Sequence, residues 1–320
     1  VVCFIDENEN DKAFLNEVIL KGSEMLKDIK KHPKYQNLKD GDFLEFPLAS
    51  NIKIEAIIIV KKPNDITEVN VRKVGAKLAN LTHYDSITLF TSNIEFLTQV
   101  TYGFQLKSYF FDKYKGERSK RVKNINILSL SPKIFKKNYL EYSALIEGIT
   151  LTRDLTNEPS NILTTEEFAK RLESLSNLGL KIQILEEAEL KKLGMNALLG
   201  VGQGSPSPSK VVIMEWQGIK GKDPLVIVGK GVVFDTGGIS LKPANGMEQM
   251  TVDMGGAGVV AGLMKTIAMK GAKKHVIGAV GLVENMPDGN AQRPGDVVTS
   301  MKGDTIEIIN TDAEGRLVLC

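Results

Sequence analysis

The apolar run from Leu225 to Asp235 carries two ionisable residues inside a pattern that is typical of a buried strand. It reads LVIVGKGVVFD. Lys230 follows the aliphatic run Val-Ile-Val and one glycine, and Asp235 precedes the sequence Thr-Gly-Gly, which is expected to turn. A charge buried alone is too costly for a folded protein, so each must be paired or bound to a metal. Because ligands of α/β sheets bind at the carboxyl ends of the strands, the run predicts a site beside Asp235.

Two interpretations of Lys230 are open from the sequence. In the first, the side chain extends to solvent or pairs with Asp235. In the second, nearby cations hold the lysine neutral, because desolvation and like charge both lower the pKa of a lysine. In either case Gly229 and Gly231 are expected to let the backbone turn tightly beside it.

A helix predicted over residues 247–269 is weakened by its own composition. Residues 255–258 read Gly-Gly-Ala-Gly, and each glycine in a helix interior costs about 1 kcal/mol relative to alanine. We therefore expect another part of the backbone to approach this stretch closely. Asp253 comes directly before it, where its carboxylate can face Asp235.

A third acidic motif, NTDAEGR, places Asp312, Glu314 and Arg316 at alternate positions. In extended backbone these side chains point the same way. Taken alone, the motif is better explained as a capping turn for the helix that Arg316 begins.

Taken together, the motifs supply four carboxylates and neither cysteine nor histidine. Oxygen-rich sites suit Mg, Mn or a carboxylate-bound Zn, and shared carboxylates can hold two metals about 3.5–4 Å apart. A His-Glu-x-x-His helix is absent from the sequence, which argues against a single-zinc protease of that kind.

Composition excludes several other classes of protein. The chain has 320 residues, 42% of them hydrophobic, and a formal net charge of +2, so no strong attraction to nucleic acid or anionic membranes is expected. The uncharged apolar run at 276–283 is far shorter than the roughly 20 residues of a membrane span. Cys3 and Cys320 stand at opposite ends, which excludes a disulfide framework and favours a reducing compartment.

The order of patterns predicts two domains. Residues 1–130 alternate between strands and helices, 131–160 form a linker helix and turn, and 161–320 hold the motifs described above. Thr164 or Thr165 is expected to cap a helix, residues 200–209 to form a loop and residues 296–309 a hairpin. The basic segment 113–123 is interpreted as a solvated surface loop, with a nucleic-acid patch as the alternative, because Tyr114 is its only aromatic residue.

Three segments resemble the signature segments of the leucine aminopeptidase (cytosol aminopeptidase) family: VGKGVVFDTGGISLKP, MTVDMGGAG and NTDAEGRLVLC. Residues 157–163 also resemble the turn that precedes that family's catalytic domain. The resemblance covers about residues 140–320. It implies an α/β fold in which an N-terminal α/β (macro-like) domain precedes a mixed-sheet α/β/α metallopeptidase catalytic domain. It also implies that the catalytic domain is incomplete at its C-terminus here, and we expect this chain to be inactive alone.

The resemblance assigns roles residue by residue. It implies a tightly bound metal held by Lys230, Asp235, Asp253 and Glu314, and an exchangeable one held by Asp235, Asp312 and Glu314. It implies catalytic roles for Lys242 and Arg316, with bicarbonate at Arg316. Met250, Asn310 and Ala313 match positions that line side-chain pockets, although each is equally consistent with packing. The implied cofactors are two divalent ions per subunit, Zn or Mn, with Mg or Co as alternatives.

The implied function is the release of N-terminal amino acids from peptides by a cytoplasmic homo-hexamer, through water activated by two metals. Two alternatives stay open. One is a DNA-binding or regulatory protein on the same fold. The other is a dimetal hydrolase of another substrate class, for which histidine ligands would be expected.

Overall fold

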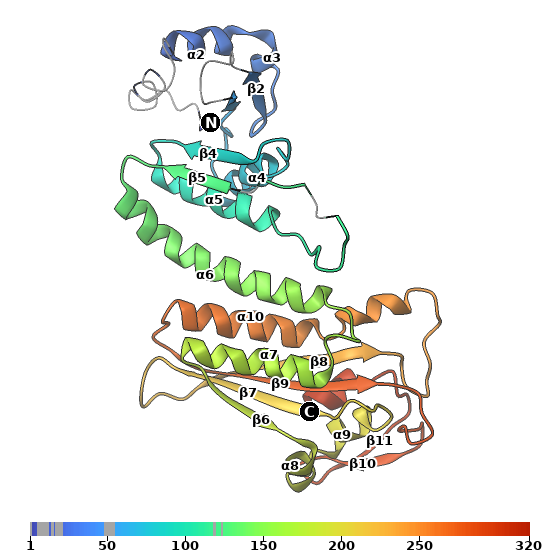
Figure 1. Cartoon of the computed structure of the whole chain (residues 1–320). Helices are drawn as coiled ribbons and strands as arrows, with labels where there is room; N and C mark the ends of the chain where they lie inside the picture. Colours follow the sequence, from blue (N-terminus) through green and yellow to red (C-terminus); the bar gives the residue numbers. More distant parts are fainter. Residues whose placement is uncertain are drawn as a thin grey trace. The chain divides into compact units, whose positions relative to one another are not determined.

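The computed structural model describes residues 2–4, 13, 16, 22–47, 55–117, 120–122 and 124–320. The chain forms two compact units, Val1–Ile146 and Glu147–Cys320 (Figure 1). The division falls inside one long helix, α6 (Pro132–Asn157), between the domain borders expected at 130 and 160. Each unit has its own sheet and its own hydrophobic core.

The first unit is built on a five-stranded sheet in the order β2-β3-β1-β4-β5. β2 runs antiparallel to β3, and the other neighbouring pairs are parallel. All residues of β3 are buried, as expected for a β-branched run inside a sheet. The strands are β1 (Val2–Phe4), β2 (Phe43–Pro47), β3 (Ala56–Val60), β4 (Ser86–Phe90) and β5 (Asn124–Leu128), and the helices are α2 (Gly22–Lys31), α3 (Pro33–Gln36), α4 (Glu68–Leu78) and α5 (Ile94–Lys107).

Two helices of this unit differ from their predicted extents. The sequence predicts a helix over residues 95–114, and this extent is wrong, because α5 ends at Lys107 and Ser108 caps it. The backbone N–H and the hydroxyl of Ser108 both donate to the carbonyl oxygen of Phe104. Apolar residues at helical spacing also predict a helix over residues 11–31, and α2 covers its second half. Most of the first half lies outside the described residues.

The second unit contains a four-stranded sheet in the order β6-β7-β9-β8. β7 runs antiparallel to both β6 and β9, whereas β8 and β9 are parallel, so the sheet is mixed as expected. The strands are β6 (Lys181–Leu185), β7 (Lys210–Gln217), β8 (Leu225–Asp235) and β9 (His275–Asn285). Because β8 and β9 are parallel, their carboxyl ends lie at the same edge of the sheet.

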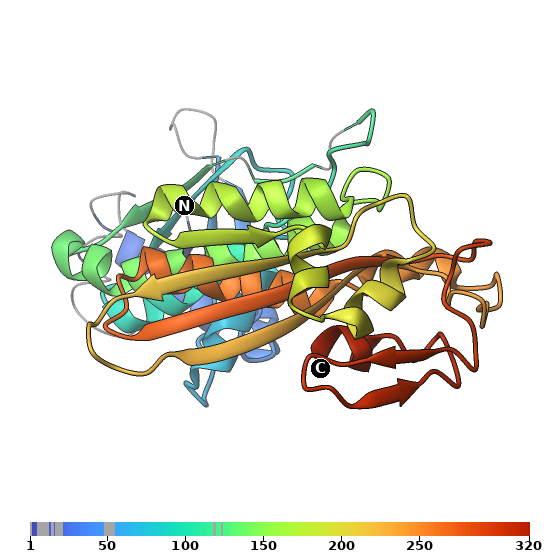
Figure 2. The same ribbon diagram turned by 90° about the horizontal axis from the view of Figure 1, so that it is seen from below.

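Helices cover both faces of this sheet and confirm the α/β/α arrangement. On one face lie α7 (Thr165–Glu173), α10 (Gly255–Met269) and the second half of α6, with Phe168, Met214 and Val260 in a buried core. Against the other face lie α8 (Glu187–Lys192), α9 (Asn196–Gly202) and α11 (Gly315–Leu319), as Figure 2 shows from below. Neighbouring residues of β8 alternate between the two cores, with Val233 in the first and Val232 in the second.

The prediction of a tight turn at Gly229 and Gly231 is wrong, because β8 continues through both glycines to Asp235. The glycines serve close packing instead. A Cβ atom on Gly229 would lie 2.8 Å from the carbonyl oxygen of Gly256 and 2.9 Å from the Cα atom of Ala257. The close backbone approach expected at the glycine-rich start of α10 is therefore confirmed, and β8 is the segment that approaches.

Residues 247–269 do not form one continuous helix. A 3-10 helix, η2 (Met247–Val252), is followed by a break at Asp253 and Met254, and α10 begins at Gly255. Met254 is fully buried in the core and Asp253 pairs with a lysine of β8, so tertiary contacts hold the break. By length and composition Met247–Met269 passes as a candidate membrane span, but half of it is buried within the unit, as in a core helix.

The structure confirms the predicted helix cap and the predicted hairpin, and it shortens one predicted loop. Thr164 caps α7 and accepts a hydrogen bond from the backbone of Glu167. The expected hairpin is formed by β10 (Val297–Thr299) and β11 (Thr305–Glu307), with Gly303 in the left-handed region at its turn. The loop expected at 200–209 is wrong at its start, because α9 extends to Gly202 and packs Leu198 and Val201 into the second core.

Candidate metal centre

The chain turns sharply where β8 ends. Gly237 and Gly238 have φ angles of 88° and 67°, in the left-handed region that favours glycine. A Cβ atom on Gly238 would lie 2.7 Å from Oδ1 of Asn285, so the turn also has no room for a side chain. The turn leads the chain back to Lys242, whose backbone N–H donates to the carbonyl oxygen of Thr236 at 2.9 Å.

Asp235, the last residue of β8, is buried and held from several directions. Its Oδ1 atom accepts hydrogen bonds from the backbone of Gly237 at 2.9 Å and from Nδ2 of Asn285 at 2.8 Å. Its Oδ2 atom lies 2.9 Å from Nζ of Lys242. The carboxylate therefore has a fixed orientation at the edge where β8 and β9 end.

A second set of hydrogen bonds joins this turn to the C-terminal acidic motif. The hydroxyl of Thr311 donates to the carbonyl oxygen of Gly237 at 2.6 Å and accepts from the backbone of Ser240 at 2.8 Å. Nδ2 of Asn285 also donates to the carbonyl oxygen of Thr311 at 3.1 Å. Sequence motifs alone do not identify Asn285, Thr311 or Ser240 as parts of this site. Asn285 and Thr311 are buried polar residues next to the predicted motifs, which is the signal that identifies them.

Lys230 pairs with two carboxylates, and the suggested pairing with Asp235 is wrong. Its Nζ atom lies 2.8 Å from Asp253 and 2.7 Å from Oε1 of Glu314. Desolvation lowers the pKa of Lys230, but the hydrogen bonds and charges of these two carboxylates outweigh it and leave the pKa raised. In this arrangement the ammonium form is favoured, and a neutral Lys230 in the presence of cations stays a prediction.

Lys242 forms the matching pair on the other side of the cluster. Its Nζ atom contacts Asp235 and donates to Oδ1 of Asp312. Desolvation lowers the pKa of Lys242, but the hydrogen bonds and charges of Asp312 and Asp235 raise it by more. The pKa of Lys242 is therefore well above its usual range. The two lysines thus divide the four acidic residues between them.

The carboxylate of Glu314 is only partly satisfied within the cluster. Its side chain is 3% exposed, and Oε2 is buried with no hydrogen-bond partner. Desolvation raises the pKa of Glu314, the hydrogen bond from Lys230 lowers it and the nearby charge of Asp235 raises it, so that the net shift of the pKa is upward. An unpartnered buried carboxylate oxygen is costly, and a cation would satisfy it.

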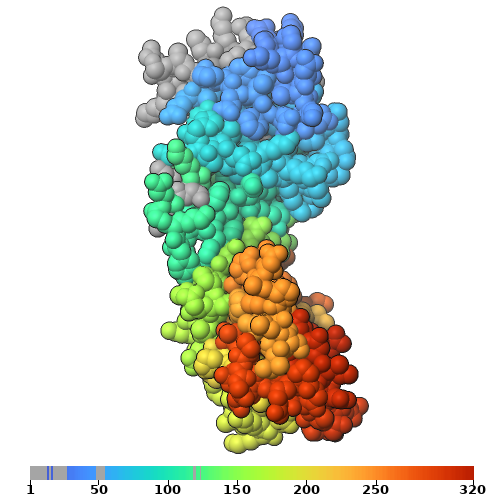
Figure 3. Space-filling view, turned by 90° about the vertical axis from the view of Figure 1, so that its right-hand side faces the viewer, coloured from blue at the N-terminus to red at the C-terminus, as the bar shows by residue number. Residues whose placement is uncertain are grey.

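The donor set as a whole fits divalent cations. Carboxylate oxygens of Asp235, Asp312 and Glu314 lie within 4.8 Å of one another. With every group ionised, the four negative charges of the cluster face the two positive charges of Lys230 and Lys242, leaving an excess of two negative charges. Figure 3 shows the orange segment around η2 and the red C-terminal segment adjoining at the surface of the second unit.

The acidic motif at 312–316 is not extended, so that expectation is wrong. Asp312 lies in a turn, Glu314 is the N-cap residue of α11 and Gly315 begins the helix, as in the capping-turn alternative. Gly315 lets the start of α11 pack closely against Lys230, because a Cβ atom on Gly315 would lie 3.1 Å from Cδ and Cε of that lysine. Asp312 and Glu314 thereby reach the cluster from a turn rather than from a strand.

The remaining predicted residues lie around the cluster rather than within its ion pairs. Arg316 is exposed on the first turn of α11, and among the described residues no carboxylate pairs with it. Asn310 is exposed, and its Oδ1 atom accepts from the backbone of Asp312 at 2.8 Å. Met250 lies on η2 and Ala313 in the turn before α11, both partly buried.

Comparison with known proteins identifies the family. The catalytic domain of the cytosol aminopeptidase family matches residues 150–320, more than half of the chain. The chain belongs to the cytosol aminopeptidase family. The resemblance drawn from the three signature segments is thereby confirmed.

Relatives in this family are 43% and 50% identical to the chain over the aligned residues. A probable cytosol aminopeptidase of Dinoroseobacter shibae is 50% identical over 285 residues, which are 89% of this chain and 58% of the relative. One of Bradyrhizobium sp. is 43% identical over 334 residues, covering 100% of this chain and 67% of the relative. The chain thus spans little more than half the length of the first of these cytosol aminopeptidases.

Solved structures in the comparison have the same fold. The bottromycin maturation enzyme BotP in complex with Mn has a TM-score of 0.77 and 30% sequence identity, over 89% of this chain and 63% of that one. A second structure of BotP gives a TM-score of 0.78 at the same identity and coverage.

Proposed function

We propose that the protein containing this chain is a metal-dependent aminopeptidase that removes N-terminal residues from peptides. The observation that carries the proposal is the excess negative charge of a half-buried ion-pair cluster in which Oε2 of Glu314 has no partner. Family membership supports the reaction class.

Two divalent cations are proposed to bind within this cluster. Lys230, Asp235, Asp253 and Glu314 would hold the tightly bound ion, and Asp235, Asp312 and Glu314 the exchangeable one. When bound, the cations supply Lewis-acid chemistry that makes a water molecule nucleophilic near neutral pH. Zn or Mn is preferred over Mg or Co, and the Mn complex of BotP supports Mn.

Lys242 is proposed to stabilise the negative charge that develops on the scissile carbonyl oxygen. An ammonium group has three N–H donors, and in this structure two of them face Asp235 and Asp312. The third donor remains for the substrate. The raised pKa of Lys242 keeps the group charged at neutral pH.

Arg316 is proposed to hold bicarbonate, which would relay a proton during the reaction. Its guanidinium is always charged, offers five N–H donors and has no carboxylate partner among the described residues. Met250, Asn310 and Ala313 are proposed to line the pocket for the substrate side chain. For the whole protein we further propose a cytoplasmic homo-hexamer.

The alternative functions have less support. In the basic segment 113–123, the ammonium of Lys113 lies 5.2 Å from the ring centroid of Tyr114, and Arg121 lies 4.0 Å from Asp112. Residues 118, 119 and 123 lie outside the described part of the chain. A dimetal hydrolase of another substrate class would be expected to use histidine ligands, and the cluster of Asp235, Asp312 and Glu314 contains none. A comparison of substrates separates that class from a peptidase.

The test uses the full-length protein after exhaustive chelation. Adding Mn²⁺ or Zn²⁺ should restore hydrolysis of leucyl-p-nitroanilide but not of p-nitrophenyl phosphate. Mn²⁺ at about 100 times its Kd should also stabilise the fold by about 2.7 kcal/mol, measured by denaturant unfolding, and Glu314→Gln should reduce this gain. Peptidase activity that survives chelation, or phosphatase activity alone, would overturn the proposal.

A further inference from the structure

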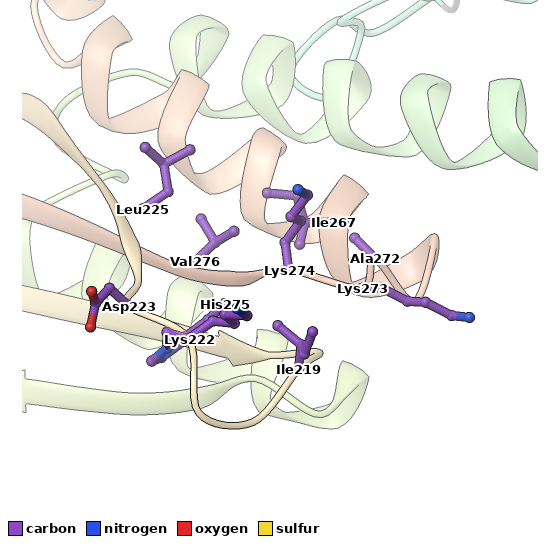
Figure 4. A pocket seen from close by; sticks show the side chains of 10 residues that line it. All are labelled: Ile219, Lys222, Asp223, Leu225, Ile267, Ala272, Lys273, Lys274, His275 and Val276. Atoms are coloured by element: carbon purple, nitrogen blue, oxygen red, sulfur yellow. The ribbon is translucent and has the colours of Figure 1, made fainter.

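A cavity of about 570 Å³ lies at the end of the second unit's sheet where β8 begins, and the metal centre lies where β8 ends. Figure 4 shows the side chains that line the cavity. It lies between the loop that follows β7, the first residues of β8 and β9, and the end of α10. Leu225 and Asp235 are the two ends of β8, so at about 3.3 Å per residue the cavity and the metal centre are roughly 30 Å apart. The proposed peptidase chemistry therefore does not use this cavity.

The lining of the cavity combines apolar side chains with lysines. Val276 is buried at its base, Ile267 is half-buried, and Ile219 and Leu225 are exposed at its walls. Three exposed lysines, Lys222, Lys273 and Lys274, also line it, against a single acidic residue, Asp223. The part of the chain that the structure describes provides no carboxylate within ion-pair distance of these three lysines.

Hydrogen bonds between the two loops build the cavity before any ligand arrives. Nδ1 of His275 lies 2.9 Å from the carbonyl oxygen of Lys222, and its Nε2 lies 2.8 Å from Oε1 of Glu215. Nε1 of Trp216 donates to the carbonyl oxygen of Ala272 at 2.8 Å. The loop after β7 and the turn before β9 are thus tied together, so a ligand would not have to order them.

We propose that this cavity binds a small aliphatic carboxylate. The apolar base would take up the hydrocarbon part, and the lysines at the rim would pair with the carboxylate group. The volume falls within the range of small-molecule pockets. The lining has no tryptophan, tyrosine or phenylalanine for base stacking, which disfavours single-stranded nucleic acid.

The test is calorimetric titration of the full-length protein with three probes that share an eight-carbon chain. Octanoate is negatively charged, 1-octanol is neutral and octyltrimethylammonium is positively charged. The protein is first stripped of metal, so that carboxylate binding at the metal centre does not contribute. We expect saturable binding of octanoate, binding of octanol weaker by about tenfold or more, and no binding of the cation.

Variants locate the binding to this cavity. Lys222→Gln combined with Lys274→Gln should weaken octanoate binding by about tenfold, and Ile219→Ser should weaken binding of octanoate and octanol alike. Lys220→Gln is the matched control, because Lys220 is an exposed lysine of the same loop that does not line the cavity. The altered side chains are exposed, so unfolding midpoints should stay close to that of the parent. Equal affinity for the three probes, absence of saturable binding, or an equal loss in Lys220→Gln would overturn the proposal.

Discussion

Nδ2 of Asn285 lies 2.8 Å from Oδ1 of Asp235 and donates a hydrogen bond to it across the ends of two parallel strands. The same amide group donates to the carbonyl oxygen of Thr311 at 3.1 Å. One side chain at the end of β9 therefore orients a carboxylate at the end of β8 and supports the turn that carries Asp312.

Replacing Asn285 by leucine should destabilise the second unit and weaken metal binding. The substitution removes one of the two hydrogen bonds to Oδ1 of Asp235 and the side-chain donor to the carbonyl oxygen of Thr311, at a total cost of about 1–3 kcal/mol. Denaturant unfolding and metal analysis of the full-length protein measure the two effects. Asn290→Leu is the control, because Asn290 is exposed and its side chain donates only to Gln203. An Asn285 variant as stable as this control would contradict the positioning role.

Substitutions within the cluster should separate metal binding from catalysis. Lys242→Ala should lower kcat by about 10²–10³-fold and Arg316→Ala should also lower it, while two metals remain bound. Asp253→Ala and Glu314→Ala should lose metal as well. Metal content by atomic spectroscopy, beside the kcat of each full-length variant, decides between the two groups. Equal depletion of metal in all four variants would show that the proposed roles are wrong.

His275 should make stability depend on pH. Hydrogen bonds to the Lys222 carbonyl oxygen and to Glu215 raise its pKa in the folded state. Its stabilising contribution is therefore fully present below the unfolded pKa of about 6.5 and is lost as pH rises through the higher folded pKa. His275→Gln should lower the unfolding midpoint clearly at pH 5.5 and much less at pH 9. The reverse order of the two differences would show that the imidazolium is not what stabilises this corner.

Two glycine substitutions test the packing of β8 against α10. Gly229→Ala should destabilise the protein by about 1–3 kcal/mol, because its Cβ atom would meet the backbone of Gly256 and Ala257 at 2.8–2.9 Å. Gly258→Ala is the matched control within α10. Its Cβ atom would make ordinary contacts at 3.5 Å or more, so the better helix propensity of alanine should stabilise by about 1 kcal/mol. Denaturant midpoints that rank the two variants in the opposite order would contradict this account.

Local patterns in the sequence determined the elements and the chemistry of the site. The cap at Thr164, the hairpin turn at Gly303 and the buried run of β3 each depend on residues a few positions apart. The sequence also predicts that the acidic residues form a site, because a charged residue within or beside an apolar run can be recognised from the sequence alone. The three segments that resemble one family contain these same acidic residues.

The tertiary structure alone decided which charges meet. Lys230 contacts Asp253 and Glu314, which are 23 and 84 positions away in the chain, and not the nearer Asp235. Packing also decided that β8 continues through its glycines, because α10 crosses there, and that the helix at 247–269 breaks at Asp253. Asn285 and Thr311 lie 26 positions apart and meet only because β9 and the C-terminal turn end at the same edge of the sheet. Contacts of this kind depend on how whole elements pack, and no local pattern of side chains encodes them.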